Sequence, residues 1–218
     1  MLEEKQDDLT REVPEKQEEE KLDIKREIIS WILTIALALG LALFLNHFII
    51  VNANVPTGSM ENTIQPKDRL IGWRLAYLSE GPERGDIIIF RYPVDEKEIY
   101  IKRVIGLSGE TIEIREGKVY INDSDTPLDE PYLKEEWKIA NDGLRLEIPE
   151  GYYFVMGDNR NNSADGRYWA GEAVMSGEAT DYDDAINKKL CFVSQKKILG
   201  KAIIRYFPKI KKFEDVDY

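Results

Sequence analysis

Ser59 and Lys102 are the two residues whose types and settings suggest covalent chemistry. Ser59 lies in the run VPTGSM at residues 55–60, just beyond a long apolar segment, and Lys102 lies in the apolar run IYIKRVIG at residues 99–106. The chain has one histidine, His47, and it lies inside the apolar segment. A hydrolytic serine here would need a base other than imidazole, and a neutral lysine amine can serve as one.

A lysine acts as a base only when its amine is neutral. An unperturbed amine with a pKa of about 10.4 is neutral in about 0.04 % of molecules at pH 7, a handicap of about 4.6 kcal/mol. Burial lowers this pKa because it disfavours the charged form. On a strand, Lys102 and Arg103 point to opposite faces, and both have apolar neighbours. A lysine at a strand edge that extends its amine into water explains the same residues.

The residues before Ser59 are suited to stabilising an oxyanion. Gly58 allows a tight turn in which the backbone approaches a substrate closely. The backbone N–H of Ser59 and the hydroxyl of Thr57 could then face the negative charge that develops during acyl transfer. A serine in an ordinary turn explains this short motif equally well.

A third segment, GDNRNNSADGRYW at residues 157–169, follows a predicted strand. Its Asp, Asn and Gly residues favour a tight loop. Ser163 could orient a lysine amine by hydrogen bonding, and Asp165 and Arg167 are spaced to form an ion pair. A purely structural loop accounts for the composition too, but not for its coincidence with the other two segments.

The composition excludes several classes of function. The net charge of -11 argues against a general nucleic-acid-binding protein. One His and one Cys cannot supply the ligands of a His/Cys zinc site, and no Walker, HExxH or GxGxxG motif is present. The composition therefore argues against most metal, nucleotide and His-triad chemistries and against a nucleic-acid partner.

The N-terminal part predicts a tail and a membrane anchor. Residues 1–27 contain 11 acidic and 6 basic side chains and are expected to be a disordered cytoplasmic tail. Residues 28–45 carry no charge, and a helix over 28–51 would be about 36 Å long, enough to cross a bilayer. Lys21, Lys25 and Arg26 precede this span, which places the N-terminus in the cytoplasm and residues 52–218 outside. The alternative of a cleaved signal peptide is disfavoured by the length of the apolar run and by its acidic leader.

Short apolar or alternating runs after residue 52 predict a mainly antiparallel β domain. Glu116-Gly117 between two alternating runs predicts a hairpin. The segments 123–149 and 170–195 do not fit the strand pattern. The predicted strands cover 69–73, 86–92, 111–115, 118–122, 152–156 and 198–207.

Taken together, these motifs resemble the type I signal peptidase family in its bacterial Ser/Lys form. The matching stretches are 56–60 (PTGSM), 84–87 (RGDI), 100–107 (YIKRVIGL), 157–169 and 200–202 (GKA). The resemblance extends from the anchor to about residue 207 and leaves out 170–195, an apparent insertion.

The resemblance implies a fold, an activity and a set of roles. The fold is a mainly β, antiparallel catalytic domain of the signal-peptidase/LexA-like kind with one N-terminal transmembrane helix. The activity is that of a serine endopeptidase of the plasma membrane that cleaves signal peptides from exported preproteins after small residues, with no metal and no organic cofactor. Its partners are those signal peptides, membrane lipid and the secretion translocon. The roles are Ser59 as nucleophile, Lys102 as general base, Thr57 and Ser59 as oxyanion hole, Ser163 as the residue that positions the lysine, and Asp165 with Arg167 as a supporting pair.

The chain departs from the family pattern at four positions. Asn62 stands where proline is common, Ser108 and Glu110 replace a usual Pro and Asp, and Gly166 replaces a usual Ser. None of these changes removes a proposed catalytic group. A Ser/Lys autoprotease and an inactive signal-peptide-binding relative are the alternative functions, whereas a β-lactamase-like Ser-x-x-Lys motif is excluded because Asn62 occupies the lysine position.

Overall fold

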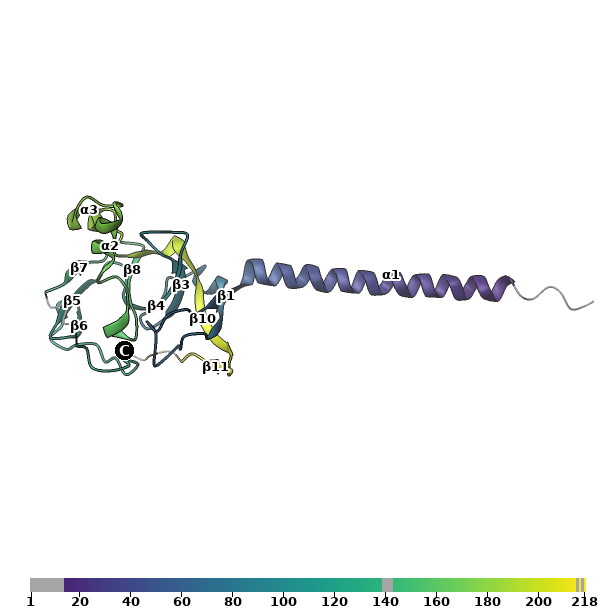
Figure 1. The fold of residues 1–218 in the computed structure, drawn as a ribbon, viewed down its shortest axis with the longest axis horizontal. Coiled ribbons are helices and arrows are strands. Elements are labelled where there is room, and N and C mark those ends of the chain that lie inside the picture. The colour runs from purple at the N-terminus through teal and green to yellow at the C-terminus, as the bar shows by residue number, and fades with distance from the viewer. Residues whose placement is uncertain (1–13, 139–142, 215, 217) are drawn as a thin grey trace, which may run out of the picture. The chain divides into compact units, whose positions relative to one another are not determined.

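The computed structural model describes residues 14–138, 143–214, 216 and 218, which divide into two compact units, one that ends at Asn46 and one that begins at His47. The first unit contains the long helix α1 (Pro14–Phe44; Figure 1). Residues 14–27, predicted as part of a disordered tail, are therefore helical, while residues 1–13 lie outside the described residues. The helix extends into this charged segment because Glu, Lys and Gln are good helix formers and Pro14 fits the first helical position.

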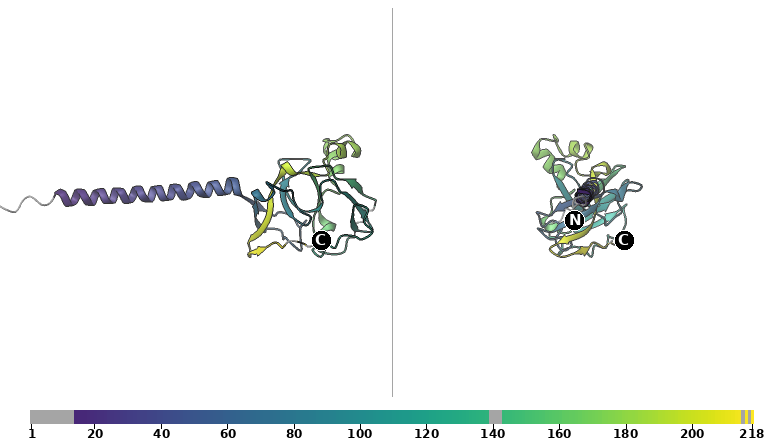
Figure 2. Two further views of the ribbon diagram at one scale, coloured as in Figure 1. Left: turned by 180° about the vertical axis from the view of Figure 1, so that it is seen from behind. Right: turned by 90° about the vertical axis from the view of Figure 1, so that its right-hand side faces the viewer.

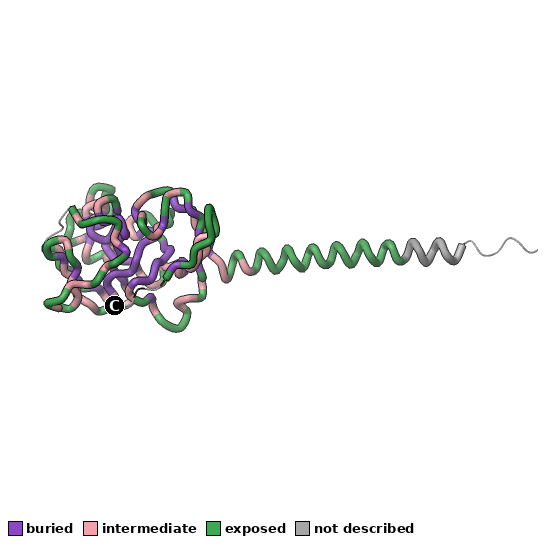
Figure 3. Tube along the Cα trace, turned by 90° about the horizontal axis from the view of Figure 1, so that it is seen from below, coloured by how far each residue is buried: buried purple, intermediate pink, exposed green. Residues whose placement is uncertain are grey.

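The segment Asp23–Ile49 is long and apolar enough to cross a membrane, and none of its most apolar stretch is buried (Figure 3). Helix α1 passes into a π-helical turn, Leu45–Ile49, before strand β1 (Ile50–Asn54) begins. The helical segment thus ends at Ile49, two residues before the predicted end of the anchor at residue 51, which stays a prediction. Ile50 and Val51 pair with strand β2 (Arg69–Trp73), and Val51 is buried, because β-branched side chains fit a sheet that packs on a core.

The main sheet of the second unit holds the candidate site. Its strand order is β1-β2-β10-β3-β4-β8-β9, with β11 paired to β10, and all its pairs are antiparallel. Strand β4 pairs with β3 along Ile99–Arg103 but with β8 only from Arg103 onward. At residues 99–102, therefore, no described strand pairs with the edge of β4 that faces away from β3. The remaining strands of this sheet are β3 (Ile87–Arg91), β4 (Ile99–Gly106), β8 (Tyr152–Met156), β9 (Val193–Ser194), β10 (Ile198–Phe207) and β11 (Lys211–Lys212).

A smaller sheet has the order β6-β5-β7. Strands β5 (Thr111–Arg115) and β6 (Lys118–Ile121) form the predicted hairpin. Glu116 and Gly117 both have positive φ, 49° and 67°, as the tight turn of a two-residue hairpin requires. Strand β7 (Arg145–Glu147) lies in the segment 123–149 that the sequence pattern left unassigned. The mainly antiparallel β class predicted from the sequence is confirmed.

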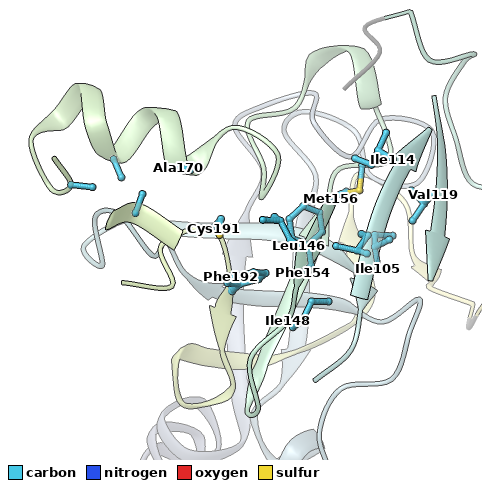
Figure 4. Close-up of a cluster of buried hydrophobic side chains, with 14 of the residues drawn as sticks. Ile105, Ile114, Val119, Leu146, Ile148, Phe154, Met156, Ala170, Cys191 and Phe192 are labelled. Carbon is cyan, nitrogen blue, oxygen red and sulfur yellow. The ribbon is translucent and has the colours of Figure 1, made fainter. Parts of the chain in front are cut away.

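The buried residues of this unit lie mainly along its strands (Figure 3). The largest cluster joins the small sheet to strand β8 and to the segment 170–195, and includes Ile105, Ile114, Phe154 and Phe192 (Figure 4). A second cluster joins β1, β2, β3 and β10 and includes Met60 and Ile64, which follow Ser59. Burial of Met60 and Ile64 therefore fixes the turn that carries the serine.

The segment 170–195 forms two short helices, α2 (Trp169–Ser176) and α3 (Tyr182–Asn187), which lie together at one edge of the unit (Figure 2). Gly177 ends α2 with φ 82°, and the Asp181 side chain accepts a hydrogen bond from Asp184 N–H to begin α3. The helices are too short for their periodicity to have predicted them. Ala173 and Ala185 are fully buried, so the segment belongs to the core.

Candidate active site

Ser59 and Lys102 meet although 43 positions separate them in the chain. The Lys102 Nζ lies 2.8 Å from the Ser59 Oγ and 3.2 Å from the carbonyl oxygen of Ile101. Ser59 is 8 % exposed and Lys102 is 4 % exposed. The Thr57 hydroxyl donates to the same Ser59 Oγ at 3.4 Å. The contact between the Lys102 amine and the Ser59 hydroxyl is the one that a proton transfer between them requires.

Burial gives the Lys102 amine its unusual acidity. Removal of water lowers the pKa of Lys102 from 10.5 to about 8, although the negative charges of Asp165 and Asp158 oppose the shift. The face of the Tyr100 ring lies 5.3 Å from Nζ and helps to exclude solvent. Lys102 therefore loses its proton about one pH unit above pH 7, whereas a solvated lysine stays charged there.

A groove of about 530 Å³ opens beside this pair. Residues 54–57 line one part of it, and residues 98–101, on and just before strand β4, line another. Ser59 and Lys102 both line this groove. The unpaired edge of β4 at residues 99–102 is thus next to the reactive groups, where an extended peptide could add as a strand.

The loop at 157–163 is bonded directly to the serine turn. Asn159 N–H donates to the Ser59 carbonyl at 3.0 Å, and the Asn159 side-chain amide donates to the Gly58 carbonyl at 3.0 Å. A Cβ at Gly157 would lie 2.3 Å from the Ser163 Oγ and 2.4 Å from the Ser59 carbonyl oxygen. Only glycine allows this close approach, which explains its place at the start of the motif.

Ser163 is buried beside Gly157, but it does not make the expected contact with the lysine. The described hydrogen bonds of Lys102 Nζ go to Ser59 and to the Ile101 carbonyl. No hydrogen bond joins the Ser163 hydroxyl to the Lys102 amine among the described residues, and Ser163 instead helps to lower the pKa of Asp165. The structure therefore brings Ser163 to the site without the predicted hydrogen bond to Lys102.

Asp165 and Arg167 form a bidentate ion pair whose side chains are fully buried. The Arg167 Nε lies 2.7 Å from Oδ1 of Asp165, and Nη2 lies 2.8 Å from Oδ2. Asp165 also accepts a hydrogen bond from Gly157 N–H at 3.0 Å. Burial alone would raise the pKa of Asp165, but the Arg167 guanidinium and the hydrogen bond from Gly157 N–H act against it, and this pKa lies below its usual range. The pair thus ties the two ends of the loop together.

Comparison with known proteins decides the family. The family model described as "Signal peptidase, peptidase S26" matches residues 28–207, most of the chain. The chain belongs to this signal peptidase family. It is 34 % identical to the probable signal peptidase I-2 of Synechocystis sp. over 80 % of this chain and 71 % of that protein, and 38 % identical to the signal peptidase I of Bacillus licheniformis over 69 % and 83 %. A crystal structure of a signal peptidase I from Enterococcus faecalis V583 covers 56 % of this chain and 97 % of its own, with 31 % identity and a TM-score of 0.40.

The predictions of family and reaction class made from the sequence are therefore confirmed: this signal peptidase is a hydrolase of the serine endopeptidase class. Its N-terminal apolar helix makes it a membrane-anchored protein. Within the described residues, no group of three or more His, Cys, Asp or Glu side chains could hold a metal ion.

The structure adds charged residues to the site that the sequence did not single out. The Arg103 guanidinium donates to both carboxylate oxygens of Asp158, at 2.9 and 2.7 Å, and both side chains are buried. Arg160 pairs in the same way with Glu130. The sequence does contain a sign of the Arg103–Asp158 pair, because Arg103 has apolar neighbours on a strand and a buried cation needs an anion.

Two of the departures from the family pattern have a structural cause. Asn62 has φ 91°, which a proline ring cannot adopt, and its amide donates to the carbonyls of Tyr132 and Leu133. A Cβ at Gly166 would lie 2.7 Å from the Phe154 ring and 3.0 Å from the Cys191 carbonyl. The Phe154 ring of strand β8 and the Cys191 carbonyl of the segment 170–195 together occupy the space that a serine side chain at position 166 would need.

Proposed function

We propose that this signal peptidase cleaves N-terminal signal peptides from exported preproteins after small residues, with Ser59 as nucleophile and Lys102 as general base. The observation that supports these roles is the 2.8 Å contact between the Lys102 amine and the Ser59 hydroxyl in a buried setting. Named relatives of this chain are signal peptidases I.

The proposed reaction has two stages. In the first, the neutral Lys102 amine takes the proton of Ser59 as Oγ bonds to the scissile carbonyl carbon, and the resulting ammonium protonates the leaving amine as the C–N bond breaks. In the second, Lys102 takes a proton from water, the water oxygen attacks the acyl-serine, and the proton returns to Ser59 as the ester breaks. The acid product and the free enzyme remain.

We assign the oxyanion hole to the Thr57 hydroxyl and the Ser59 N–H. Thr57 Oγ1 is within 3.4 Å of the nucleophile, and no described backbone hydrogen bond uses the Ser59 N–H. Donors of this kind stabilise the charge that forms on the carbonyl oxygen. Ser163 offers a buried hydroxyl to the lysine after proton transfer, and the Asp165–Arg167 pair keeps the loop in place.

The substrate would bind as an extended strand along the edge of β4 at residues 99–102. Side chains two positions apart in an extended peptide point to the same side. Small residues at the first and third positions before the cut would then face the groove together. Its apolar lining by Val55, Ile99 and Ile101 fits small apolar side chains.

We further propose that Asp23–Ile49 is retained as an anchor in the plasma membrane, with the N-terminus in the cytoplasm and the catalytic unit outside. Lys25 and Arg26 lie at the N-terminal side of the apolar stretch, as the positive-inside rule requires. Membrane lipid and the secretion translocon are the proposed partners in this location.

Cleavage of a preprotein added in trans tests the function. The full chain in detergent should cut a model preprotein at the junction that follows small residues, and should spare a preprotein with bulky residues at the first and third positions before the cut. Mass spectrometry of the products locates the cut. Self-cleavage alone would favour the autoprotease, and binding without cleavage would favour an inactive relative.

Activity should depend on pH through Lys102. Because burial lowers the pKa of Lys102 to about 8, kcat/KM should fall about tenfold per pH unit below pH 8 and level off above it. A pH series with the model preprotein measures this limb. A limb near pH 10.5, the ordinary lysine value, would contradict a desolvated base.

A further inference from the structure

Helix α2, in the segment that the family resemblance leaves out, reaches the site through stacked aromatic rings. The Tyr92 hydroxyl donates to the Glu172 carboxylate in the first turn of α2. The Tyr92 ring lies parallel to that of Tyr100, with ring centres 4.5 Å apart and planes inclined by 4°. The indole of Trp169, which begins α2, packs edge-on against both rings.

Tyr100 connects this stack to the reactive groups. Its ring lies 5.3 Å from the Lys102 Nζ and lines the groove beside Ser59. Tyr100 and Lys102 share one face of β4 because they are two residues apart. The position of the Tyr100 ring therefore affects both the wall of the groove and the access of water to the amine.

We propose that Glu172 is a positioning residue of this peptidase: it holds Tyr92, and through Tyr92 the ring of Tyr100, against Lys102 and the groove. The inference rests on the proposed Ser59–Lys102 mechanism. It gives the segment 170–195 a role in the reaction, because α2 supplies the carboxylate that fixes a wall of the active site.

The energetics favour this contact. Tyr92 is 7 % exposed, so its hydroxyl would be buried without a partner if Glu172 were lost. Burial and the Glu172 carboxylate together raise the pKa of Tyr92, which keeps the donor proton on the phenol. Burial also raises the pKa of Tyr100 to about 12, with Glu98 and Glu172 adding to the shift. Both phenols are neutral throughout the working range of the enzyme.

The charge of Glu172 and its hydrogen bond act on Lys102 in opposite directions. The charged groups around Lys102 are Asp165, Asp158, Arg167 and Glu172, and the last of these raises the pKa of Lys102 slightly. Glu172→Gln removes the charge but keeps an acceptor for Tyr92, so it should lower that pKa slightly. Glu172→Ala also frees the stack, and water that reaches the amine should raise the pKa.

The experiment compares these two variants in the full chain, with Glu178→Gln, an exposed position just after α2, as a control. Glu172→Ala should lower kcat/KM for the model preprotein about tenfold, mainly through KM, and move the acid limb to higher pH. Glu172→Gln and the control should keep most of the activity. Tyr92→Phe should match Glu172→Ala, and the double variant should lose no more than either alone.

A second measurement does not depend on activity. NMR titration of isotope-labelled lysine should show the Lys102 signal titrating at higher pH in Glu172→Ala but not in Glu172→Gln. Unchanged KM, acid limb and titration in Glu172→Ala would overturn the inference, as would equal effects of the two substitutions. If the wild-type chain failed to cleave but the titration shifted as described, the proposed function would fall while the role of Glu172 in placing the stack would stand.

Discussion

Replacement of Lys102 by methionine should abolish cleavage while making the fold more stable. Methionine has a similar shape but no amine, so no group remains to take the Ser59 proton. We expect kcat to fall by roughly four orders of magnitude or more, as when one member of a nucleophile–base pair is removed. Cleavage of the model preprotein by the full-length variant measures this loss.

The gain in stability follows from the sign of the pKa shift. Because the pKa of Lys102 is lowered from 10.5 to about 8, the unfolded chain binds the proton more tightly than the folded chain. The charged amine thus destabilises the fold below pH 8, and this penalty is relieved as the pH rises from 8 to 10.5. Lys102→Met should stabilise the catalytic unit by about 3 kcal/mol at neutral pH, and the difference should vanish above the unfolded pKa.

Two controls separate this effect from general changes. Ser59→Ala should be equally inactive but should keep the wild-type dependence of stability on pH. Lys196→Met, at an exposed position, should change neither activity nor stability. Denaturant unfolding followed by tryptophan fluorescence gives the stabilities. Normal processing by a folded Lys102→Met variant would remove Lys102 from the mechanism.

Replacement of Asp165 by asparagine should have the largest effect on stability. Both side chains of the Asp165–Arg167 pair are fully buried, and asparagine has the same shape without the charge. The Arg167 cation would stay buried without its counter-ion, since arginine does not lose its proton in proteins. Breaking such a pair costs about 3–5 kcal/mol, so we expect a catalytic unit that is only marginally folded.

The Asp165–Arg167 pair should also make the stability of the catalytic unit depend on pH. The pKa of Asp165 is held below its usual value by Arg167 against the effect of burial. The contribution of the Asp165 carboxylate to stability is therefore complete above the pKa that this carboxyl has in the unfolded chain. It is lost as the pH falls through the lower pKa that the carboxyl has in the folded chain. The free energy of unfolding should therefore fall less steeply with decreasing pH in Asp165→Asn than in the wild-type chain. The control is Asp123→Asn, because Asp123 pairs with Arg145 at the surface, with both side chains exposed. Equal stability of the two variants would contradict the assigned importance of the buried pair.

Local physical chemistry explains how much of this fold the sequence predicted. The hairpin at Glu116-Gly117 and the strands at 69–73, 111–115 and 152–156 were readable because alternation and turn residues act over a few positions. Strands β7, β9 and β11, of three residues or fewer, and helices α2 and α3 were not. Such short elements form because buried neighbours and caps hold them, not because of their own periodicity.

The same division applies to the site. Residue types and the order of the family's motifs together made Ser59 and Lys102 the predicted pair, since a chain with one histidine inside an apolar segment leaves few bases for a serine. The sequence also determined that Lys102 and Arg103 lie on opposite faces of a strand. Only the tertiary structure decided that the serine and the amine lie 2.8 Å apart, that Asn159 donates a hydrogen bond to the serine turn, and that Glu172 accepts one from Tyr92. These contacts join residues 43 to 100 positions apart, and packing of the whole chain, not any local pattern, brings them together.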